Sequence, residues 1–255
     1  MTGSFVLYAG LVGLAIGSFL NVCIFRLPAG LSVVSPRSRC PRCERPIPWH
    51  ENIPVLSYIL LRGRCRGCSQ RISLQYPLVE LATGAIWAAM AVRYGPSLAG
   101  LSSAIFLTLL LGIALTDARE YIIPNEFSIG GLLLGLGFAA VPGGMPLPRA
   151  VLGAALGFGC LYLVAVIGKW AFRKEAMGGG DIKMMAMVGA FLGPAGAVLT
   201  IFLGALLGTL IFGPIALVTR RLVPFGIFLA LGAAVAHGWG DQLVRWYLGF
   251  AFGGG

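Results

Sequence analysis

Long runs of apolar residues constrain this chain more than any other feature of its sequence. A backbone in lipid must satisfy its own hydrogen bonds, and a helix needs roughly 20 apolar residues to cross the hydrocarbon core. With a mean hydropathy of +0.88 and only 11% charged residues, the chain is not an ordinary soluble domain. We expect an all-α polytopic membrane protein with about eight transmembrane helices, several of them short. The expected spans are residues 5–25, 77–92, 98–116, 127–141, 150–168, 182–192, 195–218 and 225–236.

The distribution of cations predicts the orientation of these spans, because Lys and Arg in short loops are retained on the cytoplasmic side. Threading eight spans with the N-terminus outside leaves only Arg93, Arg149 and Arg245 outside. The net charge of +10 therefore indicates topology and attraction to anionic lipid, and no nucleic-acid partner. The first run lacks a basic leading segment and a small-residue cleavage site, so we expect a permanent helix. Beyond the first loop, the cations placed inside are Arg119, Lys169, Arg173, Lys174, Lys183, Arg220 and Arg221.

Residues 26–75, between the first two expected spans, form the one sizeable polar segment. It carries nine arginines and only Glu44 and Glu51 as acids. Two C-x-x-C pairs lie in it with 21 residues between them, which is close to the spacing of a four-thiolate zinc site. The ligands would be Cys40, Cys43, Cys65 and Cys68.

Two disulfides or four free thiols are the alternatives to zinc. The topology places the segment in a reducing cytoplasm, where persistent disulfides are uncommon. A segment of ~50 residues with few apolar side chains has too little core to fold alone, so a structural Zn²⁺ would provide much of its folding free energy. We therefore expect a zinc-stapled cytoplasmic insert. Cys23 and Cys160 lie within apolar runs and are interpreted as packing residues.

Most acidic residues of the chain are explained by positions in loops or at helix ends, but two are not. Asp117 follows "FLTLLLGIALT" at the cytoplasmic end of the third expected span, and Asp181 follows "AMGGG" just before the sixth. Both are placed near the same membrane face, so we expect them to meet. Two partly buried carboxylates held close together share one proton, which gives one base and one acid, as in aspartic proteases.

Simpler roles remain open for both aspartates. Asp181 follows three glycines and precedes a helical run, where Asp serves well as an N-cap. Asp117 could belong to an interfacial charge cluster with Arg119 and Glu120. A phosphate-binding loop is not supported, because "GGGDIK" has no Walker spacing and no preceding strand.

Several motifs resemble those of the bacterial type IV prepilin peptidases, polytopic aspartic proteases of the membrane G-x-G-D group. Gly178, Gly180 and Asp181 match the G-x-G-D element, and Asp117 in "TDAREYIIPN" matches the first catalytic aspartate. The match there includes the Ile-Pro-Asn at residues 123–125. The opening "GSFLNVCIFRLP" and the cysteine insert with "YPLVE" also match, so the resemblance covers most of residues 10–195.

This resemblance implies an activity and a set of site residues. Such enzymes remove a leader from prepilins or pseudopilins after a glycine at the cytoplasmic membrane face. Many also methylate the new N-terminus with S-adenosylmethionine, and those members carry the cysteine insert. The resemblance implies that Asp117 and Asp181 are catalytic. Support would come from Gly178, Gly180, Lys183, Pro124 and Asn125.

The site of the methyl donor has no clear sequence signal. Glu51, Asn52 and Glu80 are candidates near the insert, and the alternative for them is a solvated loop or an interfacial cap. No glycine-rich loop follows a strand in the way that a dinucleotide site requires.

The expected organisation has three parts: residues 1–25 as the first transmembrane helix, 26–75 as the zinc-binding insert associated with methyl transfer, and 76–255 as the peptidase core. The expected location is the bacterial inner (cytoplasmic) membrane, with the lipid bilayer and prepilins or pseudopilins as partners. Three alternatives stay open: a peptidase without methyltransferase activity, an ion-coupled transporter that relays protons through the two aspartates, and a zinc-stapled scaffold without catalysis.

Overall fold

The fold is that of a computed structural model, which describes residues 2–173, 177–219 and 224–252. Within these ranges all regular elements are helical, which confirms the expectation of an all-α fold. Lys174, Arg220 and Arg221, which the topology places inside, lie outside the described residues. The elements are α1 (Thr2–Arg26), η1 (Trp49–Glu51), α2 (Leu56–Leu60), α3 (Gln75–Tyr94), α4 (Leu98–Glu120), α5 (Asn125–Ala140), α6 (Leu147–Phe172), α7 (Gly179–Thr219) and α8 (Phe225–Phe252).

Five of the described helices are long and apolar enough to cross a membrane. They contain the stretches Gly3–Arg26, Leu98–Glu120, Leu147–Ala171, Gly179–Ile211 and Phe225–Tyr247. The apolar helix α5 is shorter, and α3, which covers the expected run 77–92, is not among the five. The chain is thus a multi-pass membrane protein by the length and composition of its helices.

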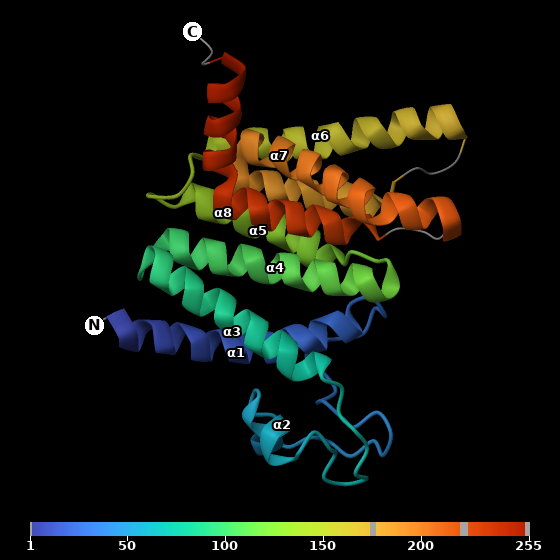
Figure 1. Cartoon of the computed structure of the whole chain (residues 1–255). Helices are drawn as coiled ribbons and strands as arrows, with labels where there is room; N and C mark the ends of the chain where they lie inside the picture. Colours follow the sequence, from blue (N-terminus) through green and yellow to red (C-terminus); the bar gives the residue numbers. More distant parts are fainter. Residues whose placement is uncertain (1, 174–176, 220–223, 253–255) are drawn as a thin grey trace. The chain divides into compact units, whose positions relative to one another are not determined.

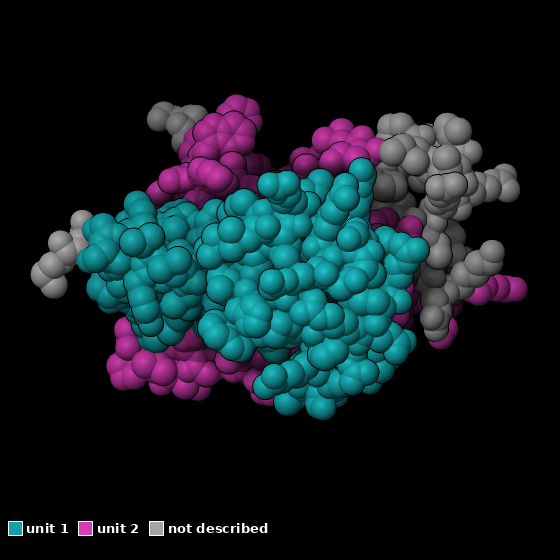
Figure 2. Space-filling model, turned by 90° about the horizontal axis from the view of Figure 1, so that it is seen from below, with its two compact units in different colours: residues 1–108 teal, residues 109–255 magenta. Residues whose placement is uncertain are grey.

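The chain divides into two compact units, residues 1–108 and 109–255, which Figure 2 colours separately. The first unit contains α1, the polar insert, α3 and the beginning of α4. The second unit contains the rest of α4 and helices α5 to α8.

Close approach between α1 and α3 organises the first unit. A Cβ atom at Gly17 would lie 2.7 Å from the Cα atom of Glu80, so glycine is needed where the two backbones meet. Small residues are common at such interfaces because the hydrophobic effect does not drive helix association in lipid, so close van der Waals contact must hold the helices together. Thr83 is fully buried beside this contact. Trp87 on α3 donates a hydrogen bond to Thr108 on α4 at 3.1 Å.

The polar insert is fastened to these helices at its ends and in its middle. Asn21, only 1% exposed, donates a hydrogen bond from α1 to the carbonyl oxygen of Tyr76 at 3.0 Å. The Tyr76 ring stacks on Phe25, with centroids 5.4 Å apart. Just before α2, the Val55 N–H donates to the Glu80 carboxylate at 2.7 Å. The insert therefore lies against one end of α3 (Figure 1).

In the second unit, α7 packs along α6 and also contacts α5 and α8 (Figure 1). Small residues again permit the contact: an added Cβ atom at Gly153 of α6 would collide with the Gly189 backbone of α7. Gly193 interrupts α7, with φ 72° and ψ −175°. This conformation is open to glycine without steric cost. Gly193 falls between the two runs expected at 182–192 and 195–218, and its non-helical backbone separates two helical parts of α7 that match these runs.

Candidate active site and metal centre

Asp117 and Asp181 come from the ends of two different helices in the second unit. Asp117 lies in the last turn of α4, and Asp181 is the third residue of α7. Both are buried, with residue exposures of 6% and 9%. The two carboxyl groups are near enough to act on one another electrostatically. The structure thus brings together two acids that are 64 residues apart in sequence.

The first turn of α8 supplies hydrogen-bond donors to Asp117. The Ile227 N–H donates to Asp117 Oδ2 at 3.1 Å, and the Gly226 N–H also donates to this carboxylate. The first N–H groups of a helix have no partner within the helix, so they are free to bind an anion. A Cβ atom at Gly226 would lie only 2.8 Å from Asp117 Oδ2, so this approach needs glycine.

Ile123 packs between the starts of α7 and α8. A Cβ atom at Gly180 would lie 2.9 Å from the Cβ atom of Ile123, and one at Gly226 would lie 2.9 Å from its Cδ1 atom. The segment between α4 and α5 therefore sets the spacing of the two helix starts that border the aspartates.

The remaining support residues also gather in this region. Pro124 is the N-cap residue of α5, and Asn125 Oδ1 accepts a hydrogen bond from Lys183 Nζ at 2.8 Å. This bond ties the start of α5 to the first turn of α7. The Gly178 carbonyl oxygen accepts the Asp181 N–H at 3.2 Å. Gly178, Gly180, Pro124, Asn125 and Lys183 thus all border the segments that carry Asp117 and Asp181.

Gly226 and Ile227 were not among the residues that the sequence indicated. Their run was predicted only as the last span, residues 225–236. They act through backbone N–H groups, which leave no trace in residue type, and only the glycine at the start of an apolar run is a signal for them.

The cysteine site in the first unit is built from two loops of the same kind. In the first loop the Cys40 N–H donates to the Arg45 carbonyl oxygen at 3.0 Å, and Glu44 has a positive φ of 54°. In the second loop the matching bond, from the Cys65 N–H, is 2.8 Å long, and the residue after Cys68 has φ 57°. Both C-x-x-C pairs are thereby wrapped in the same tight turn.

The four sulfur atoms lie at distances that suit a tetrahedral ion. All four are within 4.8 Å of one another, so the cluster could hold a metal. Cys40 Sγ is 3.8 Å from Cys68 Sγ, and Cys43 Sγ is 3.9 Å from Cys65 Sγ. A tetrahedron with Zn–S bonds of ~2.3 Å has edges of about 3.8 Å. A disulfide needs sulfur atoms only ~2.05 Å apart, so the thiols are free.

Backbone donors favour the metal-binding form of one of these cysteines. The N–H groups of Cys43 and Arg42 lower the pKa of the Cys40 thiol to about 6. The thiolate is the form that binds metal, so this turn prepares its own ligand.

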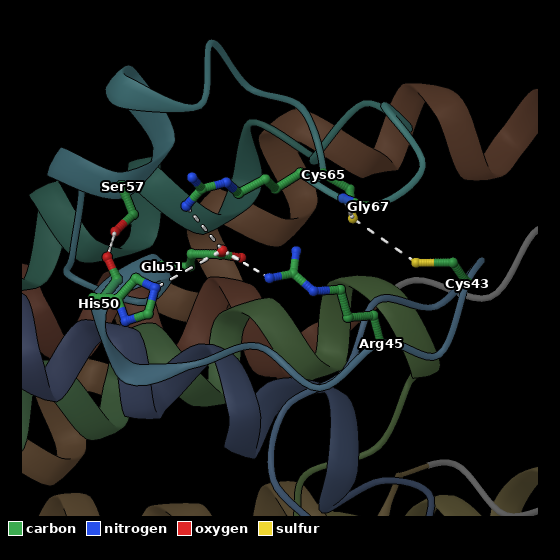
Figure 3. A network of polar contacts seen from close by, with 8 residues as sticks. Cys43, Arg45, His50, Glu51, Ser57, Cys65 and Gly67 are labelled. Carbon is green, nitrogen blue, oxygen red and sulfur yellow. Dashed lines mark hydrogen bonds and ion pairs between the residues drawn. The ribbon is translucent and has the colours of Figure 1, made fainter.

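The carboxylates suggested for the methyl-donor site already have partners in the protein. Arg45 donates to Glu51 at 2.9 Å and lowers the pKa of that carboxyl group (Figure 3). Glu80, 8% exposed, accepts the Val55 N–H. Asn52 directly follows η1 as its C-cap residue, with its N–H donating to the Trp49 carbonyl oxygen. These contacts give Glu51 a structural role within the insert and Glu80 a structural role in holding the insert to α3.

Two family models match the chain. The bacterial peptidase A24 N-terminal domain matches residues 11–94, and the type IV leader peptidase family matches residues 104–213. No solved structure matches the chain significantly.

Curated relatives named prepilin leader peptidase/N-methyltransferase cover nearly the whole chain. The protein from Aeromonas salmonicida (strain A449) is 37% identical over 93% of this chain and 92% of its own length. That from Bacillus subtilis (strain 168) is 36% identical over 94% and 97%. The Myxococcus xanthus protein is 43% identical over 74% of this chain but only 56% of its own length. The chain belongs to the type IV leader peptidase family.

Proposed function

We propose that this protein removes the leader peptide of type IV prepilins or pseudopilins, cutting after a glycine, and then methylates the new N-terminus. The observation that carries the first activity is the meeting of Asp117 and Asp181 in a buried site of a family member. The names of the relatives support both activities.

The two aspartates divide the acid and base roles. Asp117, which accepts N–H groups from α8, is the base that takes a proton from water. The water oxygen attacks the scissile carbonyl carbon while Asp181 gives its proton to the carbonyl oxygen. The intermediate then collapses, the C–N bond breaks, and the amine leaves with the proton that Asp117 holds. Asp181 recovers its proton from the hydroxyl group of the intermediate, which restores both residues.

The test is cleavage of a purified prepilin by the full chain in detergent. Asp117→Asn and Asp181→Asn should each lower the rate by ~1,000-fold or more, because each removes half of the acid–base pair. The matched control is Asp241→Asn, which changes an exposed aspartate in α8. Undiminished cleavage by a folded Asp117→Asn or Asp181→Asn protein would refute the assignment.

The membrane arrangement proposed here has about eight spans, with the N-terminus outside and the aspartates at the cytoplasmic face of the bacterial inner membrane. Sixteen of the nineteen cations fall inside with this threading, which supports it. Its partners are the prepilin substrate and the lipid bilayer. Cysteine accessibility measured from each side of intact vesicles would test the orientation.

A structural Zn²⁺ in the four-cysteine site is part of the proposal. Its support is the match between the sulfur spacings and a tetrahedral thiolate site. Cys40, Cys43, Cys65 and Cys68 would hold the ion and fill all four positions, so it would stabilise the insert without taking part in chemistry.

The methyl group would come from S-adenosylmethionine, whose sulfonium carries a transferable methyl. Glu51, Asn52 and Glu80 remain candidates for the donor site, although the partners of the two acids favour structural roles. Incubating the cleaved substrate with the donor and weighing it by mass spectrometry tests this activity. A product without the added methyl group would mean that the protein has only the peptidase activity.

A further inference from the structure

The Glu51 carboxylate lies between the two cysteine loops and binds an arginine from each (Figure 3). Arg45, two residues beyond Cys43, donates to Glu51 Oε1 at 2.9 Å. Arg66, directly after Cys65, donates to the same oxygen at 3.5 Å. The Glu51 side chain is 8% exposed, while the arginine side chains are 39% and 64% exposed. One nearly buried anion thus joins two loops whose C-x-x-C pairs are separated by 21 residues in sequence.

The turn that carries Glu51 is itself held in place. Ser57 in α2 donates to the His50 carbonyl oxygen at 3.2 Å, and Ser57 Oγ accepts the Ile53 N–H at 2.9 Å. Glu51 ends the short helix η1 that these bonds fasten to α2. The carboxylate therefore has a fixed position against which the loops are aligned.

Arg45 also makes a contact that crosses from one loop to the other. A Cβ atom at Gly67 would lie 3.2 Å from Arg45 Cδ and 3.5 Å from Cys43 Sγ. The aliphatic part of Arg45 thus passes close to the second C-x-x-C loop on its way to Glu51. The approach of the Arg45 side chain to the second loop therefore depends on where Glu51 holds the guanidinium group.

We propose that Glu51 is a positioning residue of the four-cysteine site. By binding Arg45 and Arg66 it holds the two C-x-x-C loops at the spacing that the metal requires, before the metal binds. The two loops are then partly ordered before the metal binds, so less conformational entropy is lost on binding and the ion binds more tightly. This inference rests on the proposed zinc ion.

Charge alone predicts the opposite effect from the one proposed. Four thiolates around Zn²⁺ carry a net charge of −2, whereas four free thiols carry none. Removing a nearby carboxylate makes the surroundings more positive and so favours the thiolate complex. On electrostatics, Glu51→Gln would tighten zinc binding or leave it unchanged. If Glu51 aligns the loops, the same substitution weakens binding.

The experiment measures zinc affinity of the full chain in detergent under reducing conditions, by competition with a chromogenic chelator. Glu51→Gln should weaken zinc binding by 10- to 100-fold, the usual cost of removing a group that orients metal ligands. The matched control is Glu44→Gln, which removes the other acid of the insert, exposed and adjacent to Cys43. It should leave the affinity within about 3-fold, since charge-only effects at exposed sites are small.

A double substitution separates alignment from general weakening. Arg66→Gln alone should weaken binding, and Arg66→Gln added to Glu51→Gln should cost little more, because the shared bond is already lost. Saturating Co²⁺ should give the same four-thiolate absorption in Glu51→Gln as in the parent. This spectrum would show that all four ligands remain. Arg66→Gln also serves as the test if Glu51→Gln fails to fold.

The outcomes are distinguishable. If the parent chain binds no zinc, the proposal of a structural zinc ion is itself refuted. Zinc binding by the parent with equal or tighter binding by Glu51→Gln overturns the role of Glu51. Equal weakening by Glu44→Gln, or full additivity of the Glu51 and Arg66 substitutions, overturns it as well.

Discussion

The two sites of the chain are assembled over very different distances in sequence. In the cysteine site, all four sulfur atoms come from two short turns, each closed by its own backbone hydrogen bonds. In the aspartate site, the groups come from α4, α7 and the first turn of α8, with Ile123 between two of these helices. The first site is therefore built from turns within one segment of the chain, and the second from the packing of helices.

This difference predicts where each site is vulnerable. A locally built site fails when a ligand or a turn residue changes, and the structure of distant helices should stay unchanged. A site built by helix packing fails when a close approach between helices is lost, even if both acids remain. The predictions below test this contrast, beginning with the largest effect.

Removing one thiolate should release the metal. Cys40→Ser leaves three thiolates, and a quarter of ~10–16 kcal/mol of binding free energy corresponds to roughly 60- to 700-fold weaker zinc binding. Amide hydrogen exchange should rise across residues 39–71 and stay unchanged in α1. The control is Cys160→Ser, outside the cluster in α6. Stoichiometric zinc retained by both Cys40→Ser and Cys65→Ser would contradict the site.

Adding a methyl group at Gly226 should disable the aspartate site. In Gly226→Ala the new Cβ atom would lie 2.8 Å from Asp117 Oδ2 and 2.9 Å from Ile123 Cδ1, so α8 or the carboxylate must shift. A small displacement of a catalytic group costs ~100-fold in rate. Leader cleavage at saturating substrate measures the effect. Gly249→Ala in the same helix meets no neighbouring atom and should cleave normally.

The residues at these two sites differ in how far their roles were predictable. The cysteines were predicted because the type of a metal ligand and the spacing between ligands are both visible in the sequence. Asp117 and Asp181 were noticeable because acids are rare in apolar runs. Gly226 and Ile227 bind Asp117 through backbone N–H groups, and no pattern of side chains indicates which helix start will face a given acid.

The helices show the same limit. The apolar run at 77–92 predicted α3, but it did not predict that Glu80 inside this helix binds the Val55 N–H of the insert. The two runs on either side of Gly193 match the two helical parts of α7, but the runs did not predict that both parts pack against the same level of α6 near Gly157. Composition therefore predicts the helices, and the contacts between them come from the fold.

Breaking the bond between Lys183 and Asn125 should have a moderate effect. This bond, 2.8 Å long, ties the start of α5 to the first turn of α7 but carries no catalytic proton. Asn125→Ala and Lys183→Met should each slow leader cleavage by about 5-fold, consistent with ~1 kcal/mol for a hydrogen bond to a charged partner in a partly solvated place. Additive losses in the double variant would mean that Lys183 acts elsewhere, for example on substrate.

The smallest effect is expected at the left-handed residue of the second cysteine loop. Ser69 has φ 57°, a conformation that costs an L-residue roughly 1–2 kcal/mol and a β-branched residue more. Ser69→Gly should therefore leave zinc affinity within about 3-fold of the parent, whereas Ser69→Val should weaken it by ~10-fold. Ser38→Val, at a position without positive φ beside the first loop, is the control. If Ser69→Val binds zinc as tightly as Ser69→Gly, local turn geometry does not set this site, and the contrast with the aspartate site loses its basis.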